Sequence, residues 1–121
     1  MDHEQQYRMS ANRYRDEAKI ARNTVMKLEQ QLAIDVNALI HNADQIDAGG
    51  GGEPGEAQSF REAAQRKSDE LQAQITKAQS DVANYERMAQ AEEQKADMAR
   101  HGKDKVAERL RLAGRVFDWF S

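Results

Sequence analysis

Residues 46–57 read IDAGGGGEPGEA, and this stretch decides the fold. Four consecutive glycines, Gly49–Gly52, do not sustain a helix, because each glycine costs about 1 kcal/mol relative to alanine at a helical position. Pro54 follows two residues later and is tolerated only at a helix start. The stretch therefore predicts a Gly-rich flexible turn over residues 49–55, between one helix over residues 1–48 and a second over residues 56–101.

Apolar positions at helical spacing lie on both sides of this turn. Before it they are Tyr7, Ala11, Tyr14, Ala18, Ala21, Val25, Leu28, Leu32, Val36, Leu39, Ala43 and Ile46. After it the matching positions are Ala57, Phe60, Ala64, Lys67, Leu71, Ile75, Ala78, Val82, Tyr85, Ala89, Glu92 and Ala96. We call these two sets the seam. The steps alternate between four and three residues, which is typical of helices that pack along one face.

The two halves of the seam are mirror images. Pairing them outward from the glycines matches Ile46 with Ala57 and Tyr7 with Ala96, so that every pair is centred on one point between Gly51 and Gly52. Each half has one irregularity, a double four-residue step, and the two irregularities face each other. This pattern predicts an all-α fold, a long antiparallel two-helix coiled-coil hairpin. The rival is a parallel intermolecular coiled coil interrupted by the glycines.

The seam is thin, because most of its layers set a large side chain against alanine. Two layers contain a charge, at Lys67 and at Glu92, whose ends can reach solvent. So much alanine buries little apolar area, so the isolated hairpin should be only modestly stable. We therefore expect something to cover it, either a partner protein or a second copy in a homodimeric four-helix bundle.

The predicted helix ends rest on capping residues. Asp2 is a good N-cap, with Gln5 three residues later, and Gly49 can take the left-handed conformation that ends a helix. Gly102 is expected to end or kink the second helix. Asp104 could then cap a short C-terminal amphipathic helix over residues 103–120.

Composition narrows the class of protein. Charged residues make up 32% and aromatic residues 6% of 121 residues, which suits a single long-helix domain better than a packed globular core. There is no cysteine, no run of about 20 apolar residues, and no signal peptide at the first residues. We expect a soluble cytoplasmic protein, with leaderless export left open. Residues 1–102 carry 13 basic and 18 acidic residues, which argues against a nucleic-acid partner.

Residues 103–121, KDKVAERLRLAGRVFDWFS, carry five basic and three acidic residues, the only Trp and two of the three Phe. This segment could fold back at Gly102 onto the open end of the hairpin near Tyr7, Met9 and Met88. It could instead enter the hydrophobic groove of a partner, or lie on a membrane surface. The candidate partner-binding residues are Val106, Leu110, Leu112, Val116, Phe117, Trp119 and Phe120, together with Ile34 and Ile40 near the turn.

The sequence offers little that could carry catalysis. His3 and His101 could share the open end with Glu4 and Asp97, but surface histidines near termini are seldom metal sites. We find no phosphate-binding glycine loop and no Ser–His–Asp or Cys–His set. We therefore expect no enzymatic activity, no metal and no cofactor.

The architecture is similar to the stalk proteins of flagellar and type III export ATPases and to WXG-type secreted hairpins. Residues 48–55, AGGGGEPG, stand where the latter have Trp-x-Gly, so the likeness is one of architecture and assigns no family. It favours a bacterial secretion-system chaperone or adaptor that binds a client protein. The alternatives are a phage- or plasmid-encoded inhibitor of a host protein machine, and a peripheral membrane protein anchored by residues 103–121.

Overall fold

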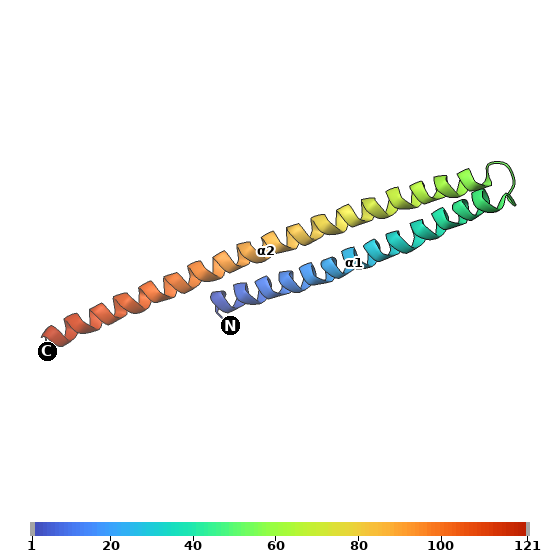
Figure 1. Cartoon of the computed structure of the whole chain (residues 1–121). Helices are drawn as coiled ribbons and strands as arrows, with labels where there is room; N and C mark the ends of the chain where they lie inside the picture. Colours follow the sequence, from blue (N-terminus) through green and yellow to red (C-terminus); the bar gives the residue numbers. More distant parts are fainter. Residues whose placement is uncertain (1, 121) are drawn as a thin grey trace. The chain divides into compact units, whose positions relative to one another are not determined.

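The computed structural model describes the backbone of residues 2–120 and the side chains of residues 2–113. It contains two helices, α1 over His3–Gly49 and α2 over Glu56–Phe120, and no strand within residues 2–120 (Figure 1). The predicted all-α helical hairpin is confirmed. Its contacts divide it into two compact units, one made of Met1–Glu17 with Asn84–Ser121 and the other of Ala18–Ala83. We describe each unit by itself.

The turn lies in the second unit and uses its glycines for geometry. The N–H of Gly50 donates to the carbonyl oxygen of Ile46 at 2.9 Å, and Gly50 has a φ of 62°. The left-handed cap is therefore one residue later than predicted. A Cβ on Gly52 would lie 2.6 Å from Cγ2 of Ile46, so the close approach of the turn to α1 also requires glycine. The predicted start of the second helix at residue 56 is confirmed.

The predicted seam is the core of both units. Every hydrophobic residue that is buried among the described side chains belongs to it, and no seam position is exposed. In the second unit these buried residues are Ala18, Ala43, Ala64, Leu71, Ile75 and Ala78, and in the first they are Ala11, Ala89 and Ala96. Burial thus follows the mirrored pattern, because each apolar stripe can leave water only by packing on another.

Ion pairs between α1 and α2 flank the seam in each unit. In the second unit Arg61 pairs with Asp44 at 3.4 Å and with Asp47, and Nζ of Lys67 lies 4.0 Å from Asp35. Lys67, one of the charged seam positions, is half-buried, with its ammonium group directed to this carboxylate.

In the first unit the flanking pairs are Arg8 with Asp97 at 3.3 Å, and Arg15 with Glu93. Exposed pairs of this kind add little stability, but they agree with the antiparallel register that the seam predicts.

One predicted boundary is wrong. α2 continues through Gly102 to Phe120, so the structure shows no separate C-terminal helix over residues 103–120 and no break after residue 101. A single glycine costs only about 1 kcal/mol in a helix, and strong helix formers such as Ala, Lys, Glu and Arg lie on both sides of it. The segment also does not fold back, since every described side chain from Arg100 to Ala113 is exposed.

Within the described residues, neither helix contains a stretch that is apolar enough for its length to cross a membrane.

The seam should carry most of the stability. Leu71 is 2% exposed, so Leu71→Ala should lower the free energy of unfolding by about 2–4 kcal/mol, because it leaves a cavity among packed neighbours. Ile34, at 69% exposed, is the matched control, and Ile34→Ala should change the same quantity by less than about 0.5 kcal/mol. Urea unfolding followed by circular dichroism measures both. Equal losses for the two variants would contradict a core confined to the seam.

Candidate interaction surface

α2 extends past the start of α1 (Figure 1). We call residues 104–120 the α2 overhang. Its described apolar side chains are largely in solvent, with Val106 at 55%, Leu110 at 69% and Leu112 at 52% exposed. Val106 and Leu110 are four residues apart and therefore lie on one face of the helix. The α2 overhang is thus a helix with an apolar face that α1 does not cover.

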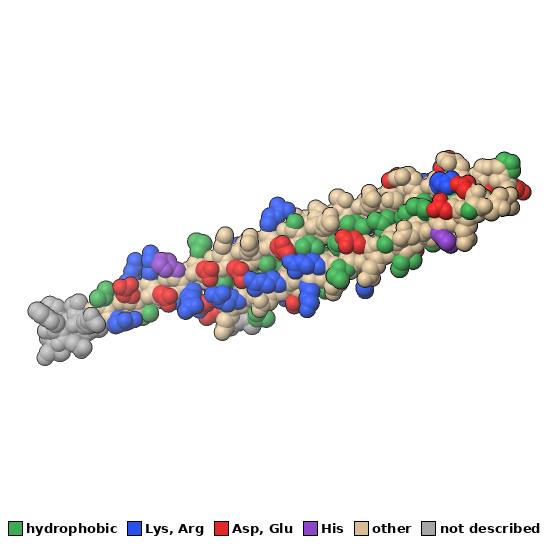
Figure 2. Space-filling model, in the orientation of Figure 1, with side chains coloured by type: hydrophobic (Ala, Val, Ile, Leu, Met, Phe, Trp, Pro, Cys, Tyr) green, Lys and Arg blue, Asp and Glu red, His purple; other side chains and the backbone are tan. Residues whose placement is uncertain are grey.

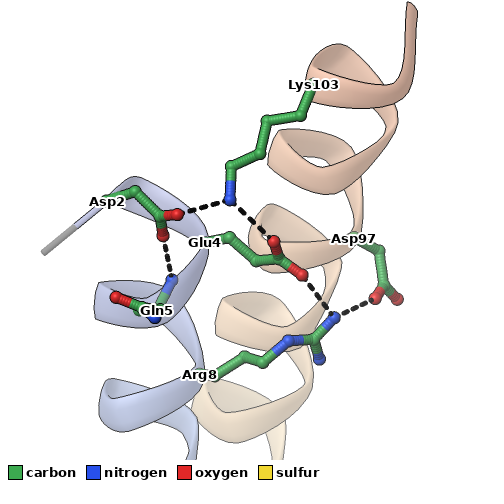
Figure 3. A network of polar contacts seen from close by, with 6 residues as sticks. All are labelled: Asp2, Glu4, Gln5, Arg8, Asp97 and Lys103. Atoms are coloured by element: carbon green, nitrogen blue, oxygen red, sulfur yellow. Dashed lines mark hydrogen bonds and ion pairs between the residues drawn. The ribbon is translucent and has the colours of Figure 1, made fainter. Parts of the chain in front are cut away.

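A polar network joins the base of the α2 overhang to the start of α1 (Figure 3). Nζ of Lys103 donates to Oδ2 of Asp2 at 2.5 Å and to Oε2 of Glu4 at 2.9 Å. The other Glu4 oxygen accepts from Arg8 at 3.3 Å, and the same guanidinium nitrogen reaches Asp97 at 3.3 Å. The network therefore fixes which residue of α2 lies beside the first turn of α1.

The same carboxylates begin α1. The N–H of Gln5 donates to Oδ1 of Asp2 at 2.8 Å, which confirms Asp2 as the N-cap. This bond, together with the ion pairs of Asp2 and Glu4, places negative charge at the positive end of the helix dipole. The start of α1 is thus set by its own capping residue as well as by its contact with α2.

The network shifts the pKa of its members. The hydrogen bond from Lys103, and then that from the Gln5 amide, hold the pKa of Asp2 below its ordinary value of 3.8. Lys103, and then Arg8, lower the pKa of Glu4 from 4.5, although partial desolvation opposes them. Asp2 and then Glu4 raise the pKa of Lys103 from 10.5. All three groups are in contact with water, so the network orients the two helix ends more than it stabilises them.

The predicted partner-binding residues fall into three sets. Val106, Leu110 and Leu112 lie on the α2 overhang as described above. The side chains of Val116, Phe117, Trp119 and Phe120 lie outside the described residues. Ile34 and Ile40 lie in the second unit, where they are 69% and 40% exposed.

Ile40 lines an open groove of about 330 Å³ together with Val36, Ala64 and Arg61. Figure 2 shows hydrophobic side chains gathered in a band between the two helices towards the glycine turn. A larger groove of about 570 Å³ lies at the turn, between Leu39, Phe60 and the segment Glu53–Glu56. These grooves widen the apolar face as the sequence predicts, but both are open to solvent.

The sequence did not single out Lys103. Its signal was the pair of acidic residues, Asp2 and Glu4, at the start of the first helix, which need a basic neighbour once the register is known. The proposed cluster of histidines with Glu4 and Asp97 is organised differently. Arg8 holds both carboxylates, and His3 stacks on Tyr7 with ring centroids 6.4 Å apart. Among the described residues no group of His, Asp and Glu is arranged to hold a metal ion.

No family model, no curated protein and no solved structure is similar to this chain at the level that would support an assignment.

Replacing Lys103 should be visible at α1. The lowered carboxyl pKa values mean that the network is intact above about pH 4.5 and is lost as the pH falls through the lowered values. In Lys103→Gln the pKa of both Asp2 and Glu4 should rise towards 3.8 and 4.5, as measured by NMR titration of their carboxyl carbons. Lys105→Gln, two residues further along the helix, should leave both unchanged. Unchanged values in Lys103→Gln would contradict the network.

Proposed function

We propose that this chain is a non-enzymatic protein-interaction module that uses the α2 overhang as its contact surface. One observation carries the proposal. The helix face that α1 covers along α2 continues into solvent as Val106 and Leu110, which are 55% and 69% exposed. An apolar helix face of this kind matches the mode in which an amphipathic helix binds a complementary helix or groove.

The rest of the described surface supports binding rather than catalysis. No polar or charged residue is buried among the described side chains, whereas catalytic groups are commonly desolvated to shift their pKa. The grooves beside Ile40 and Phe60 are open and offer no enclosed site for chemistry. They give the module a second apolar region, near the glycine turn.

Within this class we propose an adaptor or chaperone of the kind found in bacterial secretion systems. The support is indirect. The seam is lined mainly by alanine, so it leaves Ile34, Ile40 and the α2 overhang uncovered, and these surfaces are available to a client. Burying them would add apolar contact that the hairpin does not supply alone.

The test compares four immobilised forms of the chain: the full length, a chain that ends at Gly102, Leu110→Asp and Lys105→Asp. Each is incubated with lysate of the native source, and the captured proteins are quantified by mass spectrometry. Truncation and Leu110→Asp should each reduce the bound partner at least about tenfold, equivalent to about 1.4 kcal/mol, because a carboxylate cannot be buried unpaired.

Lys105→Asp introduces the same carboxylate beside the apolar face and should retain most of the binding. Circular dichroism should show equal helix content for the two point variants, since Leu110 is exposed. Equal capture by the truncated chain would contradict the proposal. Pelleting of the full chain with anionic vesicles, abolished in Leu110→Asp, would identify a membrane anchor instead and would also contradict it.

A further inference from the structure

The α2 overhang continues the seam of α2 without interruption. From Tyr85 onward the positions at alternating steps of four and three residues are Tyr85, Ala89, Glu92, Ala96, Ala99, Lys103, Val106, Leu110, Ala113, Phe117 and Phe120. Burial follows this pattern as far as α1 reaches. Ala89 and Ala96 are buried and Ala99 is half-buried, whereas Lys103, Val106, Leu110 and Ala113 are exposed. The uncovered face is therefore the same one that α1 covers in the first unit.

The positions of the seam along the α2 overhang are their own mirror image. Reading inward from the two ends, the sequence matches Lys103 with Phe120, Val106 with Phe117 and Leu110 with Ala113, all centred between Arg111 and Leu112. This is the relation that the two halves of the hairpin show about the glycine turn. Here, however, both members of each pair lie on a single helix, so the mirror can be satisfied only by a second copy.

We propose that the α2 overhang pairs antiparallel with the α2 overhang of a second copy of this chain. This inference rests on the proposed function and names the partner of its contact surface. The second copy's Phe120 would lie opposite Lys103, the residue whose ammonium group contacts the start of α1 at Glu4. The second copy's helix would thus continue the surface that α1 provides, along the same face of α2.

Only the antiparallel direction leaves room for both hairpins. In a parallel pair, the second copy's α2 would run back along the face of α2 that α1 occupies, where Ala89 and Ala96 are already buried. In the antiparallel pair the two hairpins point away from each other, and both keep their α1 contacts. A large side chain, Leu110, also meets the small Ala113, as in most layers of the intramolecular seam.

The charges of the α2 overhang do not oppose this pairing. The four positions beside the seam are Ala107, Arg109, Gly114 and Val116, of which one is charged. In the antiparallel register Arg109 lies opposite Val116 of the second copy, so no like charges face each other across the seam. The other basic residues, such as Lys105 and Arg111, occupy positions further from the seam. The segment can therefore be basic as a whole and still pair with itself.

Disulfide cross-linking tests the register directly, because the natural chain has no cysteine. Full-length Val106→Cys and Phe117→Cys are mixed in equal amounts and oxidised, and a heterodimer should form as the main product. Val106→Cys alone should cross-link poorly. In the antiparallel register its two copies are separated by the length of eleven helical residues, about 16 Å, far more than a disulfide spans.

The matched control is a mixture of Lys105→Cys and Asp118→Cys. These positions are centred on the same point of the sequence but lie away from the seam, so the heterodimer should form at a small fraction of the yield. Efficient cross-linking of Val106→Cys with itself, or equal yields for the seam and control mixtures, would overturn the proposed register.

A second measurement separates this inference from the proposed function. Light scattering of the unlabelled natural chain across about 10–500 μM should show its mass rising towards twice 13.7 kDa, whereas Leu110→Asp should stay at 13.7 kDa. A natural chain that remains monomeric throughout would overturn self-pairing. If Leu110→Asp nevertheless loses a captured protein, the interaction module stands with a different partner. If it loses neither a second copy nor another protein, the proposed function fails as well.

Discussion

The antiparallel register of the apolar seam is the constraint on which the rest of this structure depends. Alanine provides many of its layers, so little apolar area is available per residue, and a shift in register would set large side chains against each other. The turn serves this register. Gly50 adopts a left-handed conformation and Gly52 approaches Ile46 closely, which brings α2 back along the apolar stripe of α1. The ion pairs of Arg61 and Arg8 follow from that alignment rather than causing it.

The register also decides where α2 becomes uncovered. Because Asp2 caps α1 and Lys103 contacts Asp2 and Glu4, the α2 seam loses its partner immediately beyond Lys103. The sequence pattern does not change there, and Val106 and Leu110 occupy the positions that alanine occupies further back along the helix. An intramolecular interface thus becomes an intermolecular one along a single helix. The larger apolar residues of the α2 overhang suit this change, since an interface between separate molecules must also offset the entropy lost on association.

The seam could be predicted from the sequence because a long hairpin has few ways to bury an apolar stripe. Even the unusual positions Lys67 and Glu92 are half-buried as expected. The prediction at Gly102 was wrong because one glycine is a weak helix breaker between strong helix formers, whereas four in succession at Gly49–Gly52 end a helix. The Lys103 network was missed for a different reason. Its residues are about a hundred positions apart, and their proximity depends on the register, which fixes long flexible side chains less well than seam layers.

The most direct test of this account is the backbone conformation of α2 as it leaves α1. Carbon-13 NMR shifts of the full chain from Ala99 to Ala113 should have helical values at every residue, with no interruption at Gly102, because α2 is continuous there. Random-coil shifts over Gly102–Asp104, with helical values resuming afterwards, would contradict the account. The last segment would then be a separate helix that could fold back, and the seam would not continue from the hairpin into the α2 overhang.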